Sequence, residues 1–137
     1  MFKLVRNLTF WWPVKVIEPD PFNPGKTIEY QFEAEFEILD RDEDKRVKAK
    51  RAELLARLSK DSSETNIAQV EAELEALDEG SFRRAIRNWR NIGDEDGNPL
   101  VFTEETFAAA LKHDRVRAGL VKAYRDAVSQ DGARLGN

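Results

Sequence analysis

The sequence predicts an α+β fold, with a small antiparallel sheet at the N-terminus followed by four or five helices. Apolar residues recur at every second position as far as residue 39, which is typical of strands, and with helical spacing beyond it. At 137 residues and 41% hydrophobic composition, the chain is long enough to bury one core. We therefore expect a single domain over residues 1–128, followed by a flexible C-terminal tail, residues 129–137, that has little to bury.

The strand pattern is clearest from Ile28 to Ile38, where every second residue is apolar and four of the five residues between them are glutamates. Such alternation is typical of a strand with one buried and one solvated face. Residues 10–16 repeat the pattern more weakly, and Pro13 suggests that this strand lies at a sheet edge or carries a bulge. The prolines and the glycine of residues 18–26 indicate a loop. We expect two or three antiparallel strands within residues 2–39.

Two charged helices are expected next, and their charges predict an antiparallel hairpin. Acidic residues at 40–44 favour a helix start, because they interact well with the positive end of the helix dipole. This helix runs to about Ser59, and residues 61–66 separate it from a second helix. Residues 45–60 hold seven Lys or Arg, whereas residues 61–79 hold seven Asp or Glu and no basic residue. Since each exposed ion pair contributes only about 0–1 kcal/mol, we interpret the charges as orienting the two helices.

Three further helices are expected to begin at Ser81, Thr103 and Asp114, which are residue types that cap helices. The first of them would carry an apolar stripe with i, i+4 and i+7 spacing, formed by Phe82, Ile86 and Trp89. The second has two glutamates in its first turn, where the helix dipole favours them.

The sequence argues against catalysis and against a bound metal. It has no cysteine and a single histidine, His113, so thiol chemistry and His-based clusters are excluded. The spacing of a calcium-binding loop occurs at Asp94, Asp96, Asn98 and Glu105. However, Pro99 occupies the sixth position of that loop, where a sharp turn needs glycine. We predict a protein that is not an enzyme, with no catalytic residue, no metal ligand and no cofactor.

Aromatic residues are the candidates for a partner-binding surface. Trp11 and Trp12 are adjacent, so in a strand they point to opposite faces, and one of them faces away from the core of the sheet. That residue either packs under a helix or is offered to a partner. The expected helix around Trp89 is the second candidate, although its spacing also fits a buried helix face. The candidate residues are Trp11, Trp12, Phe82, Arg83, Ile86, Arg87, Trp89 and Arg90.

Both ends of the chain resemble the tail assembly chaperones of long-tailed bacteriophages, those with non-contractile tails. At the N-terminus the similarity lies in K-L-V-R-N-L-T-F-W-W-P-V-K-V at residues 3–16, a Pro/Gly loop and an F-x-A-x-F strand. Near the C-terminus it lies in Trp89, the acidic turn Asp94–Pro99, Phe102-Thr103 at a helix start, Ala123-Tyr124 within a helix, and Leu135-Gly136-Asn137. The charged middle helices lie outside the resemblance.

The resemblance implies a non-enzymatic late protein of the host cytoplasm that is absent from the mature virion. Its partners would be the tape measure protein, which it keeps soluble, the tail tube protein, whose subunits it helps recruit, and further copies of itself. The family often also makes an extended variant by translational frameshifting, and in this chain the extension would join at residues 129–137.

The alternative is a nucleic-acid-binding or regulatory phage protein that uses the basic helix faces, such as Lys45–Arg51. The net charge of −4 and the acidic helix expected beside these residues favour solvated or internally paired faces, so we expect no nucleic-acid partner. No apolar run approaches the roughly 18–20 residues that span a bilayer, so we expect no membrane partner either.

Overall fold

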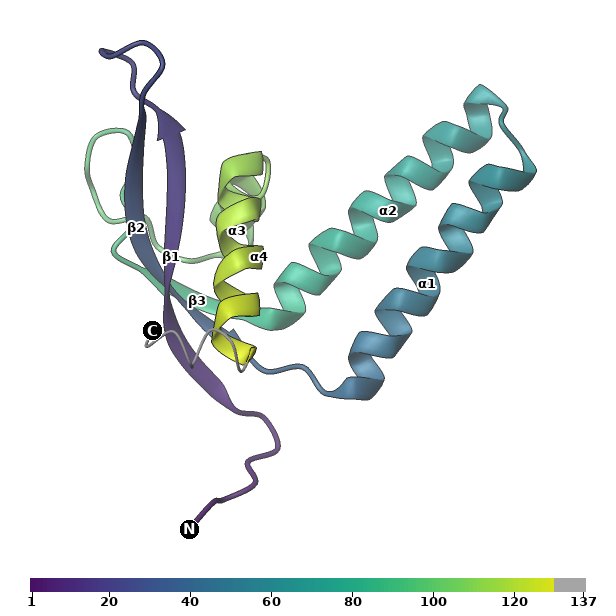
Figure 1. Ribbon diagram of the computed structural model, residues 1–137, viewed down its shortest axis with the longest axis horizontal. Coiled ribbons are helices and arrows are strands. Elements are labelled where there is room, and N and C mark those ends of the chain that lie inside the picture. Colours follow the sequence, from purple (N-terminus) through teal and green to yellow (C-terminus); the bar gives the residue numbers. More distant parts are fainter. Residues whose placement is uncertain (130–137) are drawn as a thin grey trace. The chain divides into compact units, whose positions relative to one another are not determined.

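The computed structural model describes residues 1–129 and confirms the α+β class, with three strands and four helices within that range. The chain divides into two compact units (Figure 1). The first, which we call the sheet unit, contains Met1–Glu37 and the residues from Ile86 onward. The second, the hairpin unit, contains Ile38–Ala85 and is a pair of helices. The tail expected at residues 129–137 lies outside the described residues, except for Ser129.

The sheet consists of β1 (Thr9–Pro19), β2 (Thr27–Glu37) and β3 (Ile86–Arg90), all antiparallel and in the order β1-β2-β3. The strand alternation predicted for residues 28–38 is confirmed in its centre, where Phe32, Ala34 and Phe36 are buried. It is wrong near the two ends, where Tyr30 and Ile38 are exposed. Strand β1 lies at one edge of the sheet, as Pro13 suggested.

Strand β3 stands where a third helix was expected, so that prediction was wrong. Helix α2 (Glu64–Ala85) continues past Ser81, whose hydroxyl donates to the carbonyl oxygen four residues back at 3.0 Å. Strand β3 then pairs with β2, and Arg87 has no partner in the ladder, so it forms a bulge. Because of this extra residue, Ile86 and Trp89 both face the core although they are three residues apart. A separation of three residues is also the spacing of residues on one helix face, so the sequence pattern was that of a helix although the segment is a strand.

Two helices complete the sheet unit: α3 (Glu104–Ala110) and α4 (Asp114–Val128). Thr103 caps α3 as predicted, since its hydroxyl accepts the backbone N–H of Thr106 at 3.1 Å. The cap predicted at Asp114 is wrong. This residue is the first of α4, and His113 occupies the N-cap position without a capping hydrogen bond from its side chain.

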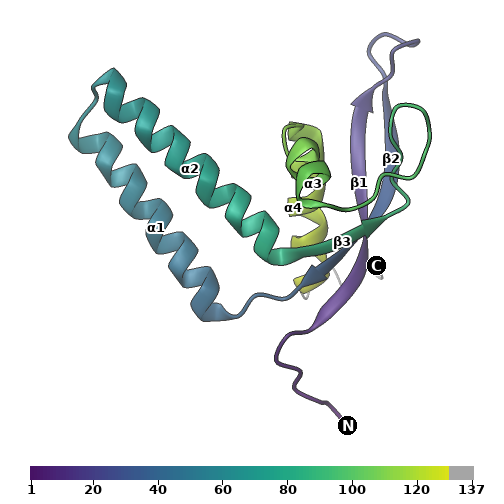
Figure 2. The same ribbon diagram turned by 180° about the vertical axis from the view of Figure 1, so that it is seen from behind.

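The core of the sheet unit lies between the sheet and these helices. Helix α4 packs against β1 (Figure 2) and comes close to it at Gly119, where an added Cβ would lie 2.5 Å from the carbonyl oxygen of Lys15. Trp89 is only 5% exposed, and its ring meets those of Phe32, Phe102 and Phe107 at centroid distances of 5.0–6.5 Å. Such edge-on aromatic contacts add to the stabilisation that burial provides.

The hairpin unit confirms the predicted pairing of the two charged helices. Helix α1 (Arg41–Lys60) runs antiparallel to α2, and the two lie side by side in both ribbon views. Arg51 forms an ion pair with Asp78, and the Nη1 atom of Arg57 lies 2.8 Å from Oε2 of Glu73. The basic helix and the acidic helix of one chain therefore lie against each other.

Candidate partner-binding surface

Trp11 is the tryptophan that faces away from the core. In β1 its side chain alternates with those of Val14 and Val16, which are buried beneath α4. On the opposite, outer face of the sheet the guanidinium carbon of Arg90 lies 4.1 Å from the centre of a Trp11 ring. Arg90 also donates from Nε to Oε1 of Glu33 at 3.0 Å. The three side chains come from three different strands, and together they form a cluster that we call the Trp11 platform.

Trp12 points to the inner face, but it is not fully covered. Its ring meets that of Phe10 edge-on at 6.3 Å, and Phe10 in turn stacks on the buried Phe36 at 5.7 Å. Trp12 also lines a hollow of about 540 Å³ beside β1, together with Ile17 and Ala123. It therefore takes part in packing and also offers part of its ring to solvent.

Residues 1–8, which sequence reasoning missed, carry the densest exposed apolar surface of the sheet unit. Figure 1 shows this segment leading away from the start of β1. Its exposed large apolar side chains are Met1, Phe2, Leu4, Val5 and Leu8. The sequence already shows five large apolar residues among these eight. Because they do not alternate as in a strand, the sequence alone could not tell whether they are buried or exposed.

The other candidate residues do not form the helical stripe that the sequence predicted. Ile86 and Trp89 are buried in β3, and the Nε1 atom of Trp89 donates to the carbonyl oxygen of Leu100 at 2.7 Å. The core interpretation of Trp89 is therefore confirmed. Phe82 and Arg83 lie in the last turns of α2, which belongs to the hairpin unit. The single helical stripe that was expected to join these residues does not exist.

The arginines around Trp89 bind glutamates. Arg87 donates from Nε and Nη2 to Oε1 of the buried Glu37, at 3.1 and 2.7 Å. The other pairs are Arg83 with Glu79, Arg84 with Glu43, and Arg90 with Glu33. Because each guanidinium already has a carboxylate, contact with a phosphate would require an ion pair to break. This geometry disfavours nucleic-acid binding through these four arginines.

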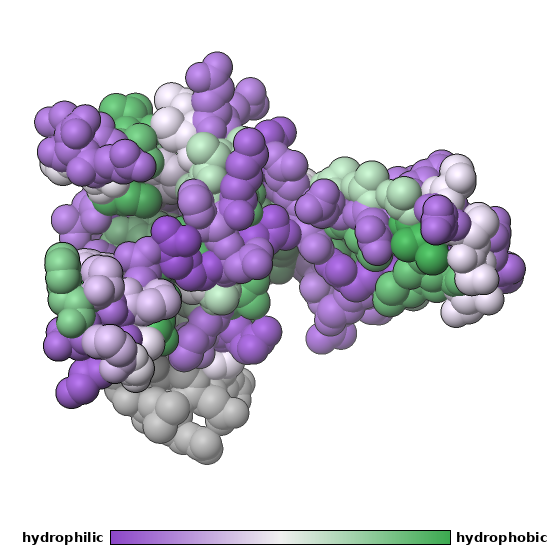
Figure 3. All heavy atoms as spheres, turned by 90° about the horizontal axis from the view of Figure 1, so that it is seen from above, coloured by the Kyte–Doolittle hydropathy of each residue, from purple (hydrophilic) through white to green (hydrophobic). Residues whose placement is uncertain are grey.

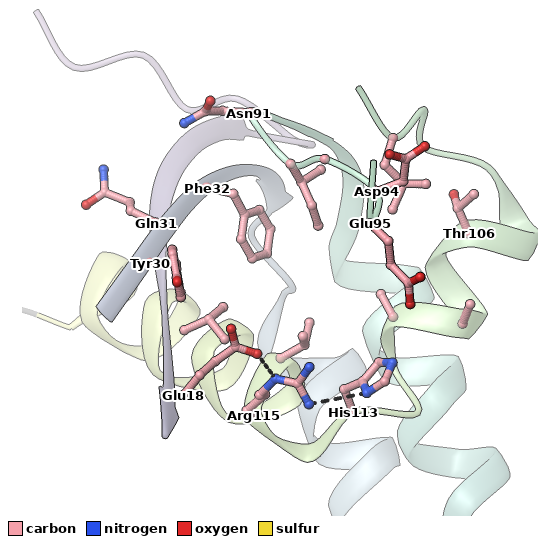
Figure 4. A pocket seen from close by; sticks show the side chains of 17 residues that line it. Glu18, Tyr30, Gln31, Phe32, Asn91, Asp94, Glu95, Thr106, His113 and Arg115 are labelled. Carbon is pink, nitrogen blue, oxygen red and sulfur yellow. Dashed lines mark hydrogen bonds and ion pairs between the residues drawn. The ribbon is translucent and has the colours of Figure 1, made fainter. Parts of the chain in front are cut away.

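A cavity of about 620 Å³ opens between the sheet, the loop after β3 and the helices α3 and α4 (Figure 4). On its wall Arg115 forms an ion pair with Glu18 and donates to Nδ1 of His113 at 3.3 Å. These polar groups bind one another across the ends of β1 and α4, and the arginine balances the charge of the carboxylate. We interpret this chain of contacts as structural, since it ties α4 to the sheet.

The acidic turn is held together by its own first residue. One oxygen of Asp94 accepts the backbone N–H groups of Asp96 and Asn98, at 2.9 and 3.0 Å. Gly97 has a φ of +82°, a conformation that suits glycine. Asp94 therefore acts here as a turn-forming residue. Within residues 1–129, no three His, Asp or Glu side chains are grouped so that they could hold a metal ion.

No known family, curated protein or solved structure matches this chain. Among the helices of residues 1–129, none has both the length and the apolar character that a membrane crossing requires.

Proposed function

We propose that this chain is a tail assembly chaperone of a long-tailed bacteriophage, a protein without enzymatic activity. It binds the tape measure protein, keeps it soluble, helps recruit tail tube subunits and associates with further copies of itself. It acts in the host cytoplasm and is left out of the finished virion. The observation that carries this proposal is the exposed apolar surface of residues 1–8, together with the Trp11 platform on the outer face of the sheet.

The chemistry of such a surface suits a long apolar client. Burying apolar area contributes about 25 cal/mol per Å², and a tryptophan can bury about 150–250 Å², so one such contact provides several kcal/mol. An exposed ion pair provides only about 0–1 kcal/mol. A chaperone that must hold an apolar chain therefore needs accessible apolar side chains, and residues 1–8 offer five of them. Arg90 holds the Trp11 ring in place before any partner arrives, which lowers the entropic cost of binding.

Co-expression with the tape measure protein of the same phage tests the proposal. We expect Trp11→Ala to leave the chaperone folded, because Trp11 is half-buried outside the core and its cation–π contact with Arg90 contributes only about 0.5–1 kcal/mol. The soluble fraction of the tape measure protein should nevertheless fall several-fold. A second variant, Phe2→Ser with Leu4→Ser, should have the same effect through the N-terminal segment.

Tyr30→Ala is the matched control, because Tyr30 is an exposed aromatic residue of the sheet that lies outside the proposed surface. It should leave the tape measure protein soluble. If the tape measure protein precipitates equally with the unmodified chaperone, the proposed function is wrong. If Trp11→Ala and the serine variant both hold it in solution, the function stands and the surface is wrong.

A further inference from the structure

The hairpin unit leaves much of its apolar stripe open. Only Leu54 and Val70 are fully buried between α1 and α2. Leu58 and Leu74 are half-buried, and Leu55 is 49% exposed. A pair of helices covers each apolar stripe from one side only, whereas a four-helix bundle covers it from both. On the hairpin, apolar atoms are visible at the surface between hydrophilic ones (Figure 3).

The open apolar residues gather on one side of the hairpin. Residues three, four or seven positions apart share a helix face, so Lys48, Arg51, Leu55 and Leu58 form one face of α1. By the same rule Ile67, Glu71, Leu74 and Asp78 form one face of α2. The ion pair between Arg51 and Asp78 shows that these two faces lie on the same side of the hairpin. Together they make a surface with an apolar centre, one basic margin and one acidic margin, which we call the hairpin face.

Part of the charge at the acidic margin is not balanced inside the chain. Among the described residues, Glu71 and Glu75 have no ion-pair partner, and Lys48 pairs only within its own helix, with Asp44 at 2.8 Å. Helix α1 has a net positive charge and α2 a net negative charge, so the charges favour a partner that presents an acidic edge to α1 and a basic edge to α2. The hairpin itself has this pattern, because its basic helix and its acidic helix lie side by side.

We propose that the hairpin face is covered by the hairpin face of a second copy of this chain, which forms a four-helix arrangement. The inference deepens the self-association within the proposed function and rests on that function for its purpose. Charge selects the symmetry. A two-fold axis parallel to the helices sets α1 of one copy beside α2 of the other, so that opposite charges meet. A two-fold axis across the helices would set α1 beside α1 and α2 beside α2, and like charges opposite each other are unfavourable.

The size of the face suits a dimer. Helix α1 has 20 residues and is about 30 Å long, and two adjacent helices are about 20 Å wide. Each copy would then bury about 600 Å², or about 1,200 Å² in total, which reaches the lower end of the range for specific interfaces. We expect a dimer that forms and separates readily and weakens as salt rises.

Cross-linking tests the arrangement, and the chain has no native cysteine to interfere. The pairs Arg51–Asp78 and Arg57–Glu73 place Leu55 level with Glu75. Rotation about a two-fold axis parallel to the helices does not move residues along the helices. Leu55 of one copy therefore lies level with Glu75 of the other. Chains carrying Leu55→Cys and differently tagged chains carrying Glu75→Cys should therefore form a mixed disulfide when combined under mild oxidation. Chains carrying Glu53→Cys, at nearly the same level but on the other side of α1, are the matched control and should not link to Glu75→Cys.

The outcomes separate this inference from the proposed function. If Leu55→Cys links mainly to itself, the two-fold axis runs across the helices and the arrangement is wrong. If the unmodified chain sediments as a monomer at about 0.2 mM, well above the roughly micromolar affinity common for small interfaces, the dimer is wrong. If the tape measure protein stays soluble in either case, the chaperone function stands without this dimer. If the mixed disulfide forms but the tape measure protein precipitates with the unmodified chain, the dimer stands and the chaperone function is wrong.

Discussion

Because α4 contacts β1 closely at Gly119, we predict that replacing glycine with alanine destabilises the protein at Gly119 but stabilises it at Gly80. A Cβ added at Gly119 would lie 2.5 Å from the carbonyl oxygen of Lys15 and 3.2 Å from Cγ1 of Val14. A Cβ added at Gly80, within α2, would have nothing within 4 Å. Both glycines lie inside helices, so alanine has the same intrinsic advantage at both positions, about 1 kcal/mol.

The magnitude follows from the distance. Carbon–oxygen contacts in proteins begin at about 3.3 Å, so α4 would have to withdraw from β1 by about 0.8 Å. A gap of that size forfeits about a quarter to a half of the dispersion energy of each contact it opens. Inserting a methyl group into a packed core usually costs about 1–3 kcal/mol. After subtraction of the helix advantage of about 1 kcal/mol, we expect Gly119→Ala to destabilise the protein by up to about 2 kcal/mol. Gly80→Ala should stabilise it by about 0.5–1 kcal/mol.

Thermal and urea denaturation measure both changes. The three tryptophans all belong to the sheet unit, so their fluorescence reports on the unit that contains Gly119, while circular dichroism at 222 nm also reports on the hairpin. For a chain of this size, a loss of up to about 2 kcal/mol corresponds to a fall in Tm of up to roughly 8 °C for Gly119→Ala. If Gly119→Ala stabilises the protein as much as Gly80→Ala does, then α4 does not approach β1 as described.

Two further predictions concern the core and the loop between β1 and β2. Trp89→Phe removes the N–H that donates to the carbonyl oxygen of Leu100, so the free energy of unfolding should fall by about 1–3 kcal/mol in urea titrations, with an unchanged m value. Hydrogen bonds from the side-chain amide of Asn23 and from the backbone lower the pKa of Asp20 below its usual 3.8. A lowered pKa means that the stabilisation is present above pH 3.8 and is lost as the pH falls through the folded-state pKa. The difference in Tm between the native chain and Asp20→Asn should therefore be larger at pH 6 than below pH 3, and a constant difference would contradict this role.

Local sequence was sufficient where an element depends mainly on its own residues. The cap at Thr103 was predictable because a hydroxyl and the nearby backbone N–H groups settle it within one turn. The pairing of α1 with α2 was predictable because the helices are adjacent in the chain and opposite in charge. The candidate surface was predicted only in part. Trp11 and Arg90 meet on the outer face, whereas Trp89 belongs to the core.

Strand β3 shows why the rest could not be predicted. Residues 86–90 extend because β2 offers them a ladder of backbone hydrogen bonds, and that partner lies about 50 residues earlier in the chain. The bulge at Arg87 then turns the side chain of Ile86 toward the core. Because the bulge interrupts the alternation of the strand, the sequence shows no period-two pattern there. A pairing between distant segments can override the helical preference of a short stretch, and it did so here.

The sequence by itself determined the α+β class, the two long strands, the charged hairpin and the helix start at Thr103, because periodicity, turn residues and charge act over a few neighbours. The tertiary structure decided that residues 86–90 form a strand, that Trp11 and not Trp12 lies on the outer face, and that Arg90 reaches its ring across the sheet. Those outcomes depend on which segments pair and in which register, and a shift of one residue in the register would turn every side chain of a strand to the other face.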